Sequence, residues 1–391
     1  MPGSFLWGAA TAAHQVEGGN WNSDWWAWEH DAASPCAEPS GDACDHLNRY
    51  AADLALLADL GFDAYRFSVE WARVEPEPDE FSRAALGHYR RVIDACRELD
   101  LLPVVTLHHF TSPRWVAARG SWAHAATADR FARFSERVAR DLGDGIAMVC
   151  TINEPNVVAD HGYGGREFAP GFGDEGARER AVEAFVAAHG KARAAVKSRV
   201  DVPVGMTLAM TDYQEVDGGG PVLERLRRRT EDVFLEAARG DDFIGVQTYT
   251  RARIGPEGPL EPEEGVETTA MGYEFWPEAI GATIARAAEV CGAPVVVTEN
   301  GIATDDDDRR IAYVERALRA VGRCIEDGIE VRGYFHWSLL DNFEWAHGYA
   351  PRFGLVSVDR TTFARAPKPS ARWLGERARA GGPPAGRIVD D

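Results

Sequence analysis

Eight short apolar runs alternate with amphipathic stretches from one end of the 391-residue chain to the other. The runs are rich in β-branched residues, which predicts strands, and the stretches between them repeat their apolar residues at helical spacing. The expected strands are 5–10, 62–68, 102–107, 146–152, 202–210, 243–249, 295–298 and 331–337. The expected helices are 45–60, 83–100, 128–141, 177–199, 222–239, 277–291, 309–327 and 369–378.

This alternation predicts an α/β protein with a parallel sheet and crossover helices. Eight units in one unbroken chain favour a single (β/α)8 TIM barrel over an open doubly wound sheet. The dinucleotide fingerprint GxGxxG follows none of the strands, which also disfavours the open sheet. We expect the catalytic barrel over residues 1–380 and a mobile Gly/Pro-rich tail over 381–391.

The net charge and the cysteines limit which partners the protein can bind and in which cellular compartment we expect it. A formal net charge of −20 argues against nucleic acid and anionic membranes as partners, because both require a basic face. No apolar run is long enough to span a bilayer, and no secretory signal precedes the first strand. The six cysteines are scattered without a CxxC pair, which predicts thiols in a cytoplasmic protein. Cys36 and Cys44 share one loop, and a bridge between them is the less favoured alternative.

Two glutamates stand where expected strands end. Glu299 follows the valine-rich run 294–297, and Glu154 follows the fourth strand in Thr-Ile-Asn-Glu-Pro. A buried strand end is a costly place for a charge, but in a barrel of parallel strands it is where catalytic residues lie. Either glutamate alone also fits a helix cap or an ion-pair partner. Together they match the pair of carboxyl groups that glycosidic bond cleavage uses.

Four segments give the chain a specific resemblance. They are the N-terminal stretch 5–18 (FLWGAATAAHQVEG), TINEP at 151–155, TENG at 298–301 and WSLLDNFEW at 337–345. In this order and spacing they resemble family 1 of the glycoside hydrolases, the β-glucosidase and β-galactosidase family. The resemblance covers almost the full length and implies a TIM barrel that cleaves β-glycosides with a retaining mechanism.

The resemblance also implies a role for each matching residue. Glu299 would be the nucleophile and Glu154 the acid/base, with Arg66 and Tyr249 donating hydrogen bonds to the nucleophile. These donors would lower the pKa of Glu299, whose charge would in turn raise the pKa of Glu154. The residues expected to bind the sugar, with Trp337 under its ring, are Gln15, His109, Asn153, Trp337, Glu344 and Trp345.

The chain departs from the family pattern at several positions. Gln247-Thr248-Tyr249 stands where the family usually shows Asn-Tyr-Tyr, which leaves the polar network beside the nucleophile in doubt. Phe110 replaces a common tryptophan, and the segment after residue 250 is short, which would open the aglycone side. Glu344 speaks against the phospho-glycosidase branch, because a carboxylate there would repel a 6-phosphate.

No cofactor or metal is expected. His108 and His109 lack a third ligand at a plausible spacing. The acidic run 305–308 precedes a helix, where the helix dipole stabilises negative charge.

From the motifs and the resemblance we expect a β-glucosidase-like hydrolase of carbohydrate metabolism that acts on a small β-glycoside or short oligosaccharide. Glucosides are the first expectation, with galactosides and fucosides open. The alternatives are a transglycosylase on the same site and a non-catalytic sugar-binding barrel. No pattern in the sequence indicates an oligomeric state.

Overall fold

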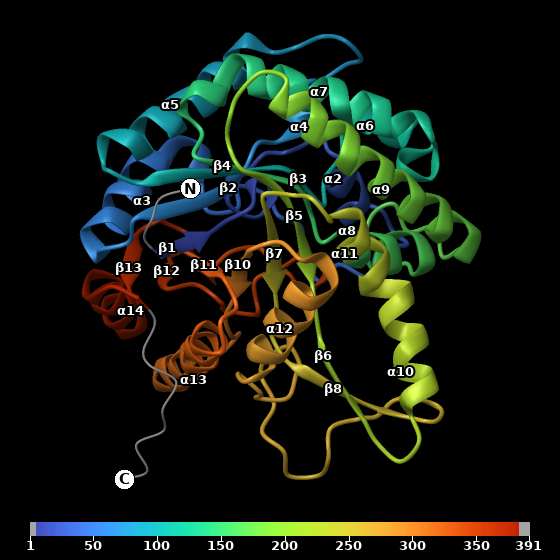
Figure 1. Ribbon diagram of the computed structural model, residues 1–391. Coiled ribbons are helices and arrows are strands. Elements are labelled where there is room, and N and C mark those ends of the chain that lie inside the picture. The colour runs from blue at the N-terminus through green and yellow to red at the C-terminus, as the bar shows by residue number, and fades with distance from the viewer. Residues whose placement is uncertain (1–4, 383–391) are drawn as a thin grey trace.

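Eight parallel strands close into a barrel at the centre of the molecule (Figure 1). The computed structural model describes residues 5–382. Every neighbouring pair runs parallel, and β1 pairs with β11, Leu6 opposite Gly333, to close the ring. The predicted TIM barrel is confirmed. Its strands are β1 (Leu6–Ala10), β2 (Ala64–Ser68), β3 (Leu102–His109), β4 (Met148–Asn153), β5 (Val204–Ala209), β7 (Phe243–Gln247), β10 (Val295–Asn300) and β11 (Val331–Trp337).

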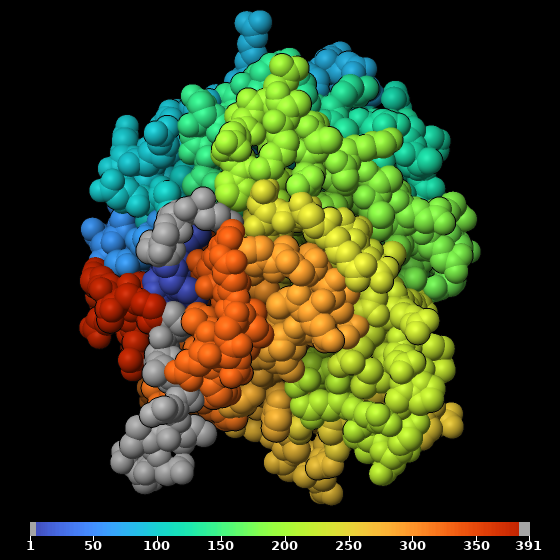
Figure 2. All heavy atoms as spheres, in the orientation of Figure 1, coloured from blue at the N-terminus to red at the C-terminus, as the bar shows by residue number. Residues whose placement is uncertain are grey.

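Helices surround the barrel, and seven of the eight expected ones are continuous. The expected helix 222–239 is instead divided by a π-helical stretch, Arg228–Asp232, whose wider turn breaks the regular α-helical bonding. In Figure 2 the last helix, in red, lies beside the blue start of the chain. The helices are α3 (His46–Leu60), α5 (Arg83–Glu98), α7 (Ala126–Leu142), α9 (Glu175–Lys197), α10 (Gly220–Arg227), α11 (Val233–Ala237), α12 (Ala279–Cys291), α13 (Asp307–Glu326) and α14 (Pro369–Ala380).

The described residues form three apolar clusters. The larger cluster lies between the strands and the helices, a second fills the barrel interior, and a small third one, which includes Ala10 and Trp337, lies where β1 and β11 end. On β10, Val296 belongs to the interior cluster, whereas Val295 and Val297 belong to the larger one. This alternation explains why the strand is apolar on both faces. At the carboxyl ends of the strands the third cluster lies beside buried polar residues such as Asn153 and Glu299.

The loops contain short elements that periodicity cannot detect. They form two small sheets, β6–β8–β9 and β12–β13, and β6 and β8 extend away from the barrel near α10 (Figure 1). The strands are β6 (Asp212–Glu215), β8 (Arg251–Gly255), β9 (Gly258–Pro259), β12 (Val356–Val358) and β13 (Arg365–Pro367). The helices are α1 (Ala13–Val16), α2 (Asp24–Glu29), α4 (Trp71–Val74), α6 (Arg114–Ala117) and α8 (Pro155–Val157), with 3-10 turns Ser121–Ala123, Gly143–Gly145 and Trp345–His347 and a π-helix Val158–Gly164.

Three further sequence expectations concern the chain as a whole. All six cysteines are free, so Cys36 and Cys44 are not bridged. Within residues 5–382 no helix is both long and apolar enough to cross a membrane. The division into a barrel over 1–380 and a tail over 381–391 stays a prediction, because residues 383–391 lie outside the described part.

Candidate active site

Glu299 lies near the end of β10, buried to 3% exposure, where two donors reach its carboxyl group. Arg66 Nη1 donates to Oε1 at 2.5 Å, and the Tyr249 hydroxyl donates to Oε2 at 2.8 Å. Arg66 comes from β2 and Tyr249 from the loop after β7, so residues far apart in sequence meet at one carboxylate. The structure thus brings together the predicted nucleophile and both of its predicted partners.

Glu154 follows β4 directly and lies at the turn into α8. Its backbone adopts a left-handed conformation (φ 44°), which is unusual for a residue other than glycine, and Pro155 opens the short helix. The side chain is 8% exposed and lines the same cavity as Glu299. Strained backbone of this kind is common at functional sites.

Burial and neighbours make the two carboxyl groups different. Burial, and next the charge of Glu299, raise the pKa of Glu154 well above its ordinary value. Burial also raises the pKa of Glu299, while Arg66 and Tyr249 oppose that rise. Arg66 and Tyr249 thus act on the pKa of Glu299 in the expected direction, but the cost of burying the carboxylate outweighs them. The order of the pair holds, with the proton favoured on Glu154 and the charge on Glu299.

A shared cavity of about 560 Å³ opens at the carboxyl ends of the strands. Among the predicted sugar-binding residues, His109, Trp337, Glu344 and Trp345 line it. The His109 ring lies nearly parallel to both tryptophans, at 5.7 Å from Trp337 and 6.1 Å from Trp345. Burial, and next the charge of Glu299, raise the pKa of Glu344 to about 8.

Gln15 and Asn153 are buried next to this cavity. Gln15 Nε2 donates to the Phe343 carbonyl at 2.7 Å and to Glu344 Oε2 at 3.4 Å, whereas its Oε1 has no hydrogen-bond partner among the described residues. Asn153 Nδ2 lies 3.3 Å from His109 Nε2, and His109 Nδ1 is likewise without a partner there. Buried polar atoms without protein partners at a cavity wall are suited to a ligand rich in hydroxyl groups.

The two unusual residues after β7 have separate partners. Gln247 Nε2 donates to Asn153 Oδ1 at 2.9 Å, so the polar network beside the nucleophile is present in altered form. Thr248 Oγ1 lies 2.7 Å from Thr283 Oγ1 and connects the strand end to α12. Phe110, in place of a tryptophan, packs against Trp345 with ring centroids 4.8 Å apart.

Sequence reasoning missed the outer wall of the cavity. These side chains come from loops without a family motif or a periodic pattern, so the sequence holds no signal that would have found them. They include Val157, Phe168, Met210, Thr211, Met271, Tyr273 and Phe353. Apolar and aromatic side chains therefore outnumber polar ones in this part of the lining, which also contains His161, Glu167, Thr250 and His347.

The two alternative metal or ion sites have structural explanations. His108 packs edge-on against Trp122 at 5.0 Å, and its Nε2 lies 3.3 Å from Ser112 Oγ. Asp306 caps α13 by accepting from the backbone N–H groups of Asp308 and Arg309.

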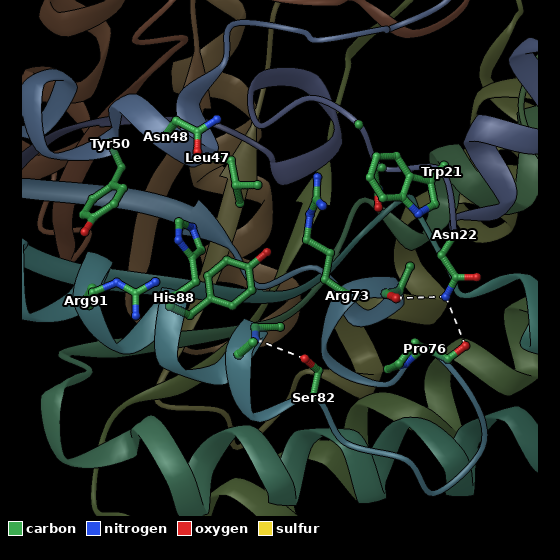
Figure 3. A pocket seen from close by; sticks show the side chains of 16 residues that line it. Trp21, Asn22, Leu47, Asn48, Tyr50, Arg73, Pro76, Ser82, His88 and Arg91 are labelled. Carbon is green, nitrogen blue, oxygen red and sulfur yellow. Dashed lines mark hydrogen bonds between the residues drawn. The ribbon is translucent and has the colours of Figure 1, made fainter.

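A second, larger cavity of about 630 Å³ lies outside this site (Figure 3). In that view Tyr50, His88 and Arg91 lie on one side and Trp21 on the other. Its described lining includes Arg73 and Arg91 but no carboxyl group. Chemistry that needs two carboxyl groups therefore belongs to the cavity of Glu154 and Glu299.

Comparison with known proteins gives the family. The model of glycosyl hydrolase family 1 matches residues 1–221 and 241–382. The chain belongs to glycosyl hydrolase family 1. Its members are retaining glycosidases, and this chain is accordingly a glycoside hydrolase.

Family relatives match over nearly their whole length. Beta-glucosidase A of Thermotoga maritima is 33% identical, covering 95% of this chain and 96% of the relative. A bifunctional beta-D-glucosidase/beta-D-fucosidase of Bifidobacterium breve is also 33% identical, covering 95% and 97%. The crystal structure of beta-glycosidase BGL167 has a TM-score of 0.92 at 49% identity and covers 99% of both chains.

Proposed function

We propose that this family 1 enzyme hydrolyses terminal β-D-glucosides, with Glu299 as the nucleophile and Glu154 as the acid/base. The observation that carries the proposal is the asymmetry of two carboxyl groups on one cavity. Glu299 receives Arg66 and Tyr249 as donors, which stabilise its ionised form. Glu154 faces the charge of Glu299 and keeps its proton.

The proposed reaction has two displacements. A Glu299 oxygen attacks the anomeric carbon while Glu154 transfers its proton to the departing glycosidic oxygen, which leaves a glycosyl ester on Glu299 and releases the aglycone alcohol. Glu154, now ionised, takes a proton from water as the water oxygen attacks the anomeric carbon. The ester bond breaks, Glu299 is a carboxylate again, and the β-configuration is retained.

The cavity supports a neutral sugar with an apolar or aromatic aglycone. Gln15, His109 and Glu344 offer hydrogen-bonding groups, and the indole of Trp337 offers a flat surface for the C–H face of a sugar. The Thermotoga maritima and Bifidobacterium breve relatives are named as glucosidases, and the second also as a fucosidase, so we expect β-fucosides to be accepted as well. The apolar outer wall, including Phe168 and Tyr273, favours aryl or alkyl aglycones. Six free thiols favour the cytoplasm as the compartment.

The test is hydrolysis of 4-nitrophenyl β-D-glucoside by the wild type and by Glu299→Gln. We expect the variant to lose activity by about ten-thousandfold or more, because the amide cannot form the ester. Glu267→Gln is the control, since that carboxyl group is exposed and pairs with Arg309 outside the cavity. Nuclear magnetic resonance should detect β-glucose as the first product. Full activity in Glu299→Gln, or α-glucose as the first product, would overturn the proposal.

The same assay separates the transglycosylase alternative. With an alcohol added at high concentration, a hydrolase still releases mostly free glucose, whereas a transglycosylase yields mostly the alkyl glucoside. Turnover by the wild type in either form excludes a non-catalytic sugar-binding barrel.

A further inference from the structure

Gln247 occupies a site position for which the family resemblance gives no role. It is the last residue of β7 and pairs in register with Glu299 on β10, after a shift in the pairing beyond Val297. The side chain is 1% exposed and lines the cavity. Within the described residues its side chain makes one hydrogen bond, the 2.9 Å contact from Nε2 to Asn153 Oδ1, and its Oε1 has no partner there.

The side-chain oxygen of Asn153 accepts hydrogen bonds from residues on three other strands. Arg66 Nη2 from β2, Thr207 Oγ1 from β5 at 3.1 Å and Gln247 Nε2 from β7 all donate to Oδ1. A guanidinium can only donate, so the end of the amide facing Arg66 has to be the oxygen. The Asn153 amide is therefore fixed with its Nδ2 on the opposite side, toward His109.

We propose that Gln247 is a positioning residue that holds the Asn153 amide so that Nδ2 donates to the 2-hydroxyl of the sugar. This inference rests on the proposed function and on the sugar-binding role that the family resemblance implies for Asn153. Hydrogen bonds to the 2-hydroxyl strengthen in the transition state, so an Asn153 amide held by Arg66 and Thr207 alone, and therefore less precisely placed, lowers kcat more than it changes KM. Gln247 acts through Asn153 and carries no proton in the reaction.

The length of the side chain matters for this role. Asparagine, which the family usually shows here, is shorter by one C–C bond of about 1.5 Å. From an unchanged backbone its amide would lie beyond hydrogen-bond distance of Asn153 Oδ1, since the present contact is already 2.9 Å. The longer glutamine therefore suits the position of the β7 end in this chain.

The test compares two substrates in Gln247→Leu, which keeps the approximate volume and removes the donor. For an aryl β-D-glucoside we expect kcat/KM to fall at least about tenfold, mainly in kcat, because one buried hydrogen bond orienting Asn153 is lost. For the matching aryl 2-deoxy-β-D-glucoside we expect a fall of less than about twofold, since the hydroxyl that Asn153 contacts is missing. Thr248→Val is the matched control, because Thr248 bonds to Thr283 instead of the network, and both substrates should stay within about twofold.

Each outcome decides a different claim. An equal fall for both substrates, or unchanged kinetics, overturns the positioning role of Gln247. A wild type that hydrolyses neither substrate overturns the proposed function instead. If Gln247→Leu does not fold, Gln247→Met serves in the same comparison, because it has nearly the same length, carries no charge and has no N–H to donate to Asn153. An equal response of Gln247→Met to both substrates has the same meaning as for Gln247→Leu.

Discussion

Glu154 and Glu299 carry the same chemical group, and their surroundings determine which of them holds a proton. Both are buried, which disfavours ionisation of either. Only Glu299 receives a guanidinium and a phenol, and once it is ionised its charge further disfavours ionisation of Glu154. One cation, Arg66, is thus enough to favour the ionised form of Glu299 and, through the charge on Glu299, the protonated form of Glu154.

Removing the acid should depend on the leaving group. We expect Glu154→Gln to lower kcat/KM by about a hundredfold or more for an alkyl β-glucoside, whose oxygen must be protonated as it leaves. For 2,4-dinitrophenyl β-glucoside, whose phenolate leaves without a proton, the first displacement should change little. Stopped-flow release of dinitrophenol measures that first step directly. An equal loss for both leaving groups would contradict the role of Glu154 as the acid.

Removing the Tyr249 hydroxyl should move the acid limb of the pH profile. Glu299 must be ionised to attack, and Tyr249 favours the ionised form, so Tyr249→Phe raises the pKa of Glu299 further. The fall in kcat/KM at low pH should then begin at a pH higher by about one unit. The alkaline limb, which reports Glu154 losing its proton, should move less. Tyr273→Phe is the control, because Tyr273 lines the cavity and has no bond to Glu299.

At the residue scale, the sequence predicts the site residues that belong to a recognisable motif. Glu154, Glu299, Arg66 and Tyr249 were predicted and lie together as expected. The sequence predicted how the two donors act on the pKa of Glu299 but not that burial outweighs them, because the cost of burial is a property of packing and cannot be seen in a local motif. The partner of Gln247 was equally unpredictable, since it depends on the register between strands 94 positions apart in sequence.

At the scale of elements, the caps of the long helices are a testable feature. Asp306 is the N-cap of α13, and its Oδ1 accepts from Asp308 at 3.0 Å and from Arg309 at 3.2 Å. Asp306→Ala should lower the free energy of unfolding by about 1 kcal/mol, because these N–H groups lose their acceptor. Asp305→Ala is the control, since its ion pair with Arg352 is exposed and worth little. Urea unfolding measures both, and equal losses would contradict the capping role.

Long periodic elements were predictable, and short or irregular ones were not. The barrel strands appear within about two residues of their expected bounds because each buries a whole apolar run. The prediction of one continuous helix over 222–239 was wrong. The change to π-helical bonding at Arg228–Asp232 leaves the apolar spacing almost unchanged, so periodicity does not reveal it. Short helices such as α1, which carries Gln15, are held by tertiary contacts and have too few residues to show a period.

At the scale of the whole molecule, residues near the two ends of the chain come together in both the barrel and the helical layer. The barrel closes where β1 pairs with β11, and the outer layer closes where α14 packs against α3. Leu374 and Ala371 of α14 are fully buried, so the last helix is part of the core. The closure requires a close approach, because a Cβ on Gly375 would lie 1.9 Å from the carbonyl oxygen of Leu60.

This contact predicts opposite effects for the same substitution at two helical glycines. Gly375→Ala should lower the free energy of unfolding by about 1–3 kcal/mol, because the methyl group meets backbone that cannot rotate away. Gly190→Ala, in the exposed middle of α9 with no atom within 4 Å of the added carbon, should raise it by about 0.5–1 kcal/mol through helix propensity alone. Denaturant midpoints of the two variants measure the difference. If Gly375→Ala were as stable as Gly190→Ala, α3 and α14 would not be in the tight contact that closes the outer layer, and α14 would contribute burial without fixing the position of α3.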